Sequence, residues 1–183
     1  MTRNTCSFFG HRKIEVSEEL ELKVKMVIED LILNHNVTTF LFGSKSEFNY
    51  LCLEIVTNLK NKYNFIKRIF YTCRSEFCIL EKEKSKYEEL YSYHLKRDVK
   101  LFGFEEEFEH KTKYTSGRAS YVERNQTMID DCNYCIFYYN ESYQPEMRKY
   151  AKRYLGYYQP KSGTRIAYNY AKQKKKTIIN VFN

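Results

Sequence analysis

One stretch from Thr38 to Val56, TTFLFGSKSEFNYLCLEIV, constrains the fold of this chain more than any other. Its segment 39–42 is apolar or β-branched, which is typical of a buried strand, and a turn with a glycine follows at once. Beyond the turn, apolar residues recur at the spacing of a helix: Phe48, Leu51, Cys52, Ile55 and Val56. The stretch therefore predicts a strand, a tight turn and a helix in immediate succession.

The turn consists of Gly43, Ser44, Lys45 and Ser46. A turn that opens a helix leaves backbone N–H groups unpaired at the positive end of the helix dipole, so it suits an anion and above all a phosphate. The serine hydroxyls and the Lys45 ammonium would add donors. The sequence equally allows that Ser46 simply caps the helix, and the spacing matches neither the P-loop nor the G-x-G-x-x-G pattern.

The same alternation of strand and helix runs along most of the chain. Strands are predicted at 5–9, 37–42, 65–72, 134–139 and 177–182, and helices at 17–34, 47–61, 118–131 and 162–174. The remaining segments are less regular: 81–94 has a helical pattern, 96–102 suits a strand, 105–113 is too charged to be buried, and 140–160 is an irregular connection rich in tyrosine. We therefore predict a single α/β domain over residues 1–183, a sandwich with a mainly parallel sheet and a less regular insert at about 73–117.

Three glycine turns follow predicted strands or open predicted helices: Gly10-His11-Arg12, Gly43-Ser44-Lys45-Ser46, and Ser162-Gly163-Thr164. In open parallel sheets, ligands bind outside the carboxyl ends of the strands, near the point where the strand order reverses. If the turns converge there, they outline a single phosphate-binding cleft.

The chain carries a formal net charge of +8, which favours an anionic partner, either a nucleotide or a polynucleotide. Part of this excess comes from four lysines between 172 and 176, near a predicted helix end where cations are favourable in any case. No stretch approaches the roughly 18 apolar residues of a membrane span, and the N-terminus lacks the pattern of a signal peptide. We therefore expect a cytoplasmic protein with no membrane partner.

The six cysteines lie mostly in apolar runs and form no framework of the kind found in secreted proteins, so we expect them to be reduced. Cys132-x-x-Cys135 has the spacing of a redox or zinc motif. It lies in a predicted strand, however, where period-two alternation would send the two side chains to opposite faces. We therefore expect no metal and no cofactor.

Four motifs in this order resemble the YpsA-like branch of the SLOG superfamily: TCSFFGHR, FLFGSKSEFNYL, YVERNQTMIDDCNYCIFYYN and KSGTRIAYNYA. The superfamily comprises Rossmann-like proteins, among them the lonely-guy phosphoribohydrolases and the DNA-processing protein A. The resemblance covers nearly the whole chain except about 73–115. It implies a Rossmann-like three-layer sandwich with a site for a nucleotide or nucleotide derivative.

The resemblance also implies roles for single residues. Phosphates would meet the backbone at Gly43, Ser44, Ser46, Gly163 and Thr164. Arg12 and Arg124 would supply positive charge, although Arg124 and Asn125 would also suit an exposed helix start with local hydrogen bonds. His11 would contact a base edge or a ribose, or only shape its turn.

The chain departs from the enzymes of this superfamily at one informative position. Glu123-Arg124-Asn125-Gln126-Thr127-Met128 is similar to their E-R-K-x-x-M helix, but Ala167 stands where their second motif carries a glutamate. Cleavage of an N-glycosidic bond passes through an oxocarbenium-like state that a carboxylate stabilises, and a methyl group cannot do this. Glu123, Asp130 or Asp131 would have to replace that glutamate.

Three functions follow as hypotheses. The first is binding of a nucleotide-derived small molecule by a sensor or sequestering module, in bacterial or phage signalling or conflict. The second is an N-glycosidase or phosphoribohydrolase with relocated acids, and the third is binding of single-stranded nucleic acid. Superfamily relatives often form dimers, and tyrosines in 138–158 would suit a homodimer interface.

Overall fold

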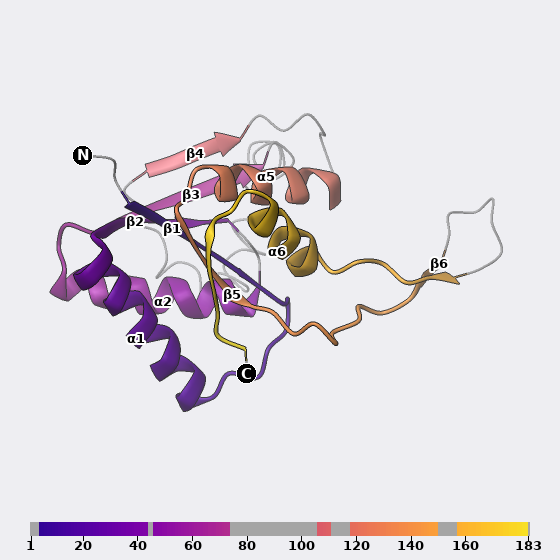
Figure 1. The fold of residues 1–183 in the computed structure, drawn as a ribbon, viewed down its shortest axis with the longest axis horizontal. Helices are drawn as coiled ribbons and strands as arrows, with labels where there is room; N and C mark the ends of the chain where they lie inside the picture. Colours follow the sequence, from indigo (N-terminus) through magenta and orange to yellow (C-terminus); the bar gives the residue numbers. More distant parts are fainter. Residues whose placement is uncertain (1–3, 44–45, 74–105, 111–117, 150–156, 183) are drawn as a thin grey trace, which may run out of the picture.

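The computed structural model of the chain describes residues 4–43, 46–73, 106–110, 118–149 and 157–182 (Figure 1). The expected helix at 81–94, the expected strand at 96–102, and Ser44 and Lys45 lie outside the described residues. The described elements up to residue 73 are β1 (Asn4–Gly10), α1 (Glu18–His35), β2 (Val37–Phe42), α2 (Glu47–Lys62) and β3 (Lys67–Cys73). The later ones are β4 (Glu106–His110), α5 (Arg118–Asp130), β5 (Tyr134–Tyr138), β6 (Arg148–Lys149), β7 (Tyr157–Tyr158), α6 (Gly163–Gln173) and β8 (Thr177–Asn180).

The main sheet has six strands in the order β4-β3-β2-β1-β5-β8, and every neighbouring pair in it is parallel. The chain therefore builds the sheet outward from β1 in one direction as far as β4, and then in the other direction through β5 and β8. The strand order reverses between β1 and β5. This confirms the predicted α/β fold, a Rossmann-like three-layer sandwich with a parallel sheet.

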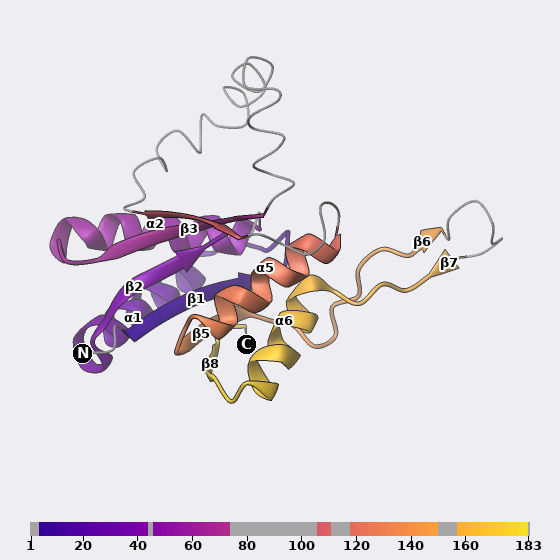
Figure 2. The ribbon, with the colours of Figure 1, turned by 90° about the horizontal axis from the view of Figure 1, so that it is seen from above.

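Of the helices that the structure describes, α1 and α2 cover one face of the sheet, and α5 and α6 cover the other (Figures 1 and 2). Consecutive side chains of β1 point to opposite faces of the sheet: Phe8 packs with α1 and α2, and Phe9 packs with α5 and α6. β1, β2 and β5 are buried along most of their length, as expected for strands that are covered on both faces. The two hydrophobic cores therefore hold these three strands so that their carboxyl ends lie together. We call this end of the strands the carboxyl edge of the sheet, and the opposite end its amino edge.

Charged and short strands were harder to predict. The segment 105–113 contains β4, which pairs with β3 at the edge of the sheet, and charged sequence is common in edge strands. The connection 140–160, expected to be irregular, contains β6 and β7, which pair antiparallel in an arm that projects from the body of the molecule (Figure 2). In the part of the chain that the structure describes, no helix combines the length and apolar character needed to cross a membrane.

The expectation that Cys132 and Cys135 point to opposite faces was wrong. α5 ends at Asp130 and β5 begins only at Tyr134, so Cys132 lies in the turn between them rather than in the strand. Its Sγ lies 3.3 Å from that of Cys135, and both side chains are buried. Among the described residues, no further His, Cys, Asp or Glu joins them in a cluster suited to a metal ion.

Candidate functional site

The turn after β1 is fixed against the first turn of α2. The Glu47 N–H donates to the carbonyl oxygen of Arg12 at 3.0 Å, and the Glu47 carboxylate accepts from the Ile14 N–H at 2.9 Å. Gly10 permits this approach, since a Cβ at that position would lie 2.4 Å from the Phe48 Cβ. The Gly10-His11-Arg12 turn and the start of α2 therefore form one unit, from which the Arg12 side chain extends exposed.

The end of β2 meets α5 at Gly43. A Cβ on Gly43 would lie 2.7 Å from the Tyr71 carbonyl oxygen and 3.3 Å from Cδ of Arg124. Arg124 itself is only 2% exposed, and its guanidinium lies 5.2 Å from the centre of the Tyr121 ring and 3.5 Å from the Asn125 side-chain oxygen. Because a guanidinium is always charged, Arg124 brings a buried positive charge to the carboxyl end of β2.

The N-termini of α2 and α6 are both capped by serine but differ in what they leave open. Ser46 accepts from the Asn49 N–H at 3.2 Å, so its expected role as a cap is confirmed, and the Glu47 N–H is already bonded to Arg12. Ser162 accepts from the Arg165 N–H at 3.0 Å. The Gly163 and Thr164 N–H groups come first in α6 and therefore have no partner within the helix itself. The first turn of α6 is therefore suited to an anion.

Basic side chains surround this first turn. Lys161 and Arg165 are both exposed next to it, and Arg118 at the start of α5 donates to the Lys161 carbonyl oxygen. No acidic residue occurs in the first turn of α6. Cationic side chains and the first N–H groups of the helix together favour an anion at this place.

His11 is buried where β1 and β5 end, at the reversal of strand order. Its Nε2 lies 3.0 Å from the Asn140 nitrogen and accepts the backbone N–H, which places the single N–H hydrogen of the neutral ring on Nδ1. Nδ1 is buried and has no hydrogen-bond partner among the residues that the structure describes. Burial also lowers the pKa of His11, so the neutral ring is favoured.

Tyrosines from β5 and the connection after it enclose the His11 ring. The centre of the Tyr143 ring lies 4.1 Å from it, and those of Tyr139 and Tyr138 lie at 6.1 and 6.4 Å. Tyr139 also stacks on Tyr168 of α6 at 4.5 Å. Asn140 and Tyr143 were not predicted as site residues, because they follow His11 by more than 125 residues in a segment without regular pattern.

An open groove of about 440 Å³ lies where β5 and β8 end, beside the first turns of α1. Tyr138 lines it and links it to His11. Its lining residues are Glu15, Ser17, Glu19, Leu20, Lys23, Tyr138, Val181 and Phe182. This groove could not be predicted from the sequence, since its walls come from three separate segments.

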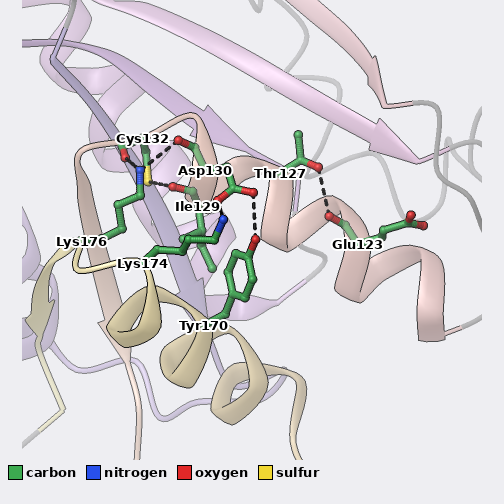
Figure 3. A network of polar contacts seen from close by, with 8 residues as sticks. All are labelled: Glu123, Thr127, Ile129, Asp130, Cys132, Tyr170, Lys174 and Lys176. Carbon is green, nitrogen blue, oxygen red and sulfur yellow. Dashed lines mark hydrogen bonds and ion pairs between the residues drawn. The ribbon is translucent and has the colours of Figure 1, made fainter.

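Two of the candidate acids lie at the opposite, amino edge of the sheet, since α5 ends there and β5 begins there; Figure 3 shows the first of them, Asp130. Asp130 ends α5, and its carboxylate accepts from the Tyr170 hydroxyl and pairs with Lys174, each at 2.9 Å. Asp131 accepts from the Tyr71 hydroxyl at 2.9 Å. The structure therefore does not bring these two carboxylates to the carboxyl edge with the glycine turns.

The two other positions considered for cleavage chemistry lie on α5 and α6. Glu123 precedes Arg124 on α5, is half-buried, and accepts the Thr127 hydroxyl at its backbone oxygen at 3.2 Å. Ala167 is 2% exposed and packs in the core between α6 and the sheet. A glutamate at this position would require a buried charge.

Comparison with known proteins assigns the chain to no family. No model of a protein family matches the chain, and no curated protein is significantly similar to it. The resemblance to the YpsA-like branch therefore stays a prediction from the four motifs.

Proposed function

We propose that the protein binds a nucleotide or a nucleotide-derived small molecule at the carboxyl edge of the sheet. The observation that carries the proposal is the reversal of strand order between β1 and β5, with His11 and Asn140 at that point. Ligands of open parallel sheets bind at such reversals. The glycine turns after β1 and β2 lie on one side of it and α6 on the other.

The phosphate end of the ligand belongs at the first turn of α6. The N–H groups of Gly163 and Thr164 would donate to phosphate oxygens, and Arg118, Arg165 and Lys161 would balance the charge. Arg12 and the buried Arg124 extend the positive potential toward β1 and β2.

Binding without cleavage is favoured over an N-glycosidase. The oxocarbenium-like state of that reaction needs a nearby carboxylate. Asp130 and Asp131 are engaged at the other edge of the sheet, and Ala167 is packed in the core. Glu123, next to Arg124 on α5, is the one carboxylate left of the three candidates. We therefore infer a sensor or sequestering module, and on the motif resemblance alone we assign it to YpsA-like proteins of bacteria or phages acting in the cytoplasm.

Native mass spectrometry and isothermal titration test this proposal. The panel would contain AMP, NAD, ADP-ribose and cyclic nucleotides, and we expect at least one to bind with micromolar affinity. Arg165→Gln should weaken that binding about tenfold, the equivalent of one charge-assisted hydrogen bond. Arg148→Gln removes an exposed arginine from the projecting arm and should change nothing. If no compound binds more tightly than millimolar, the proposal fails.

The projecting arm favours a second candidate, binding of single-stranded nucleic acid. Arg148 and Lys149 are exposed on β6, and the Lys149 ammonium lies 5.7 Å from the ring of the exposed Tyr157 on β7. Cations and stacking rings together are the means by which proteins hold single strands. Here Arg148→Gln should weaken binding of an oligonucleotide and reduce its salt dependence, while Arg165→Gln serves as the control. Binding that is insensitive to salt would exclude this candidate.

A further inference from the structure

The hydrogen-bond pattern of His11 assigns each ring nitrogen a different task. Nε2 accepts from the Asn140 N–H, so its lone pair is already used. The hydrogen of the neutral ring then lies on Nδ1, which is a donor. His11 is therefore unsuited to take a proton from a ligand, and what it offers at Nδ1 is a hydrogen bond.

A buried donor without an acceptor is unfavourable, and native proteins rarely retain one without a reason. His11 is only 3% exposed, and no acceptor for its Nδ1 exists among the described residues. The surrounding rings of Tyr138, Tyr139 and Tyr143 offer aromatic surface on which a planar group would stack.

Tyr143 is the most exposed of these three residues, at 40%. It belongs to a tight turn in which its N–H donates to the Asn140 carbonyl oxygen at 3.2 Å, and the Ser142 N–H donates to the Asn140 side chain at 2.8 Å. None of these hydrogen bonds involves the Tyr143 ring, so a second planar ring could lie beside the Tyr143 ring without breaking the turn.

We propose that the Nδ1–H of His11 donates a hydrogen bond to an acceptor atom on the base of the ligand, in a stack with Tyr143. The site then selects a planar heteroaromatic base and not merely a sugar phosphate. This inference rests on the proposed function, because it concerns the base of the same ligand, at the end farthest from the phosphate at α6. His11 acts as a specificity-determining binding residue.

Two substitutions at position 11 separate the two nitrogens. The amide of Gln reaches about as far as Nε2 and keeps an acceptor for Asn140, but it removes the Nδ1 donor. The amide of Asn reaches about as far as Nδ1, so it keeps a donor there and loses the acceptor for Asn140. Titration of the wild type, His11→Gln and His11→Asn would use AMP and ribose 5-phosphate as probes.

We expect AMP to bind about tenfold more weakly to His11→Gln, and ribose 5-phosphate to bind equally to the wild type and this variant. His11→Asn should recover part of the difference between the two probes. An equal loss for both probes, or no loss for either, would overturn the role of His11 and leave the proposed function standing. If neither probe binds the wild type while other nucleotides of the panel do, the inference for AMP is overturned.

Nitrogen-15 NMR of the histidine side chains provides a test that needs no variant. The His11 ring should be neutral with its hydrogen on Nδ1 before any ligand is added. Addition of AMP should shift the Nδ1–H resonance and slow its exchange, whereas ribose 5-phosphate should not. A hydrogen found on Nε2, or an unchanged resonance with AMP bound, would overturn the inference.

Discussion

Gly10 and Gly163 lie in similar turns of the sequence but in different surroundings. A Cβ at Gly10 would overlap the Phe48 side chain, whereas one at Gly163 would meet nothing within 4 Å. We predict that Gly10→Ala lowers the free energy of unfolding by about 1–3 kcal/mol through overpacking, and that Gly163→Ala changes it by no more than about 0.5 kcal/mol. Urea denaturation of both variants measures the difference, and equal midpoints would contradict it.

His11 should make stability depend on pH. Burial lowers its pKa in the folded state below the value of about 6.5 expected when unfolded. As pH falls below about 6.5, His11 binds a proton in the unfolded state but not yet in the folded state. The free energy of unfolding therefore decreases until the pH passes the lower pKa that His11 has in the folded state. Thermal unfolding of the wild type and His11→Gln between pH 8 and 5 isolates this effect, because the other titrating groups are common to both. Parallel curves would show that His11 does not contribute.

At the scale of elements, α5 connects the two edges of the sheet. It carries Arg124 beside Gly43, and its C-terminus is tied down by Lys176, whose ammonium donates to the carbonyl oxygens of Asp130 at 2.9 Å and Cys132 at 2.7 Å (Figure 3). A cation at this end also suits the helix dipole.

Lys176→Met should therefore lower the free energy of unfolding by about 1 kcal/mol, since two carbonyl groups lose a charged donor. The neighbouring Lys175 is exposed, and its left-handed backbone would be unchanged by methionine. Lys175→Met should therefore have almost no effect. Chemical denaturation of the pair measures the difference. A loss in Lys175→Met as large as that in Lys176→Met would mean that general charge, not the cap of α5, is responsible.

The turn between α5 and β5 should form a disulfide under oxidation. The hydrogen bond with Cys135, together with burial, raises the pKa of the Cys132 thiol well above its usual value, so the native pair should react slowly at neutral pH. Refolding with oxidised glutathione should link Cys132 to Cys135: the two thiols lose two electrons and two protons, and the glutathione disulfide becomes two thiols. Peptide mass mapping without reductant detects the link, and Cys132→Ser should abolish it. Linkage of Cys6 to Cys52 in its place would contradict this prediction.

Elements with a regular apolar pattern could be predicted from the sequence, and elements without one could not. α1 was expected at 17–34 and is found at Glu18–His35, because its apolar stripe and its Ser17 cap are local signals. β4 was not recognised, because its charges follow from its place at the edge of the sheet. β6 and β7 are too short for any pattern, and only their pairing defines them.

On the scale of the whole molecule, stability should decrease from the centre of the sheet outward. β1 and β5 are paired on both sides and covered by helices on both faces, whereas β8 is paired with β5 alone. We predict that amides of β1 and β5 exchange with solvent most slowly, near the rate set by global unfolding, and that those of β8 exchange faster. Hydrogen exchange followed by mass spectrometry tests this, and equal protection of β8 and β5 would contradict it.

The site as a whole was only partly predictable. The sequence identified the turns at Gly10, Gly43 and Gly163, since glycine before a helix is a local signal. It did not reveal that Asn140 fixes the His11 ring, which depends on β1 and β5 being neighbours in the sheet. Nor did it reveal that Asp130 and Asp131 lie at the other edge, because that follows from the direction in which α5 crosses the sheet.

The two edges of the sheet also differ in how freely their residues can be substituted during evolution. The amino edge is held by Lys176 and by Asn133, which bonds both Thr5 and Thr177, and none of these residues takes part in the proposed site. If a nucleotide binds at the carboxyl edge as proposed, substitutions around His11 and the first turn of α6 would alter the bound molecule while leaving the ties of the opposite edge intact. One ligand could then be exchanged for another in a few mutational steps, because the residues that would recognise the ligand are not those that hold the amino edge together.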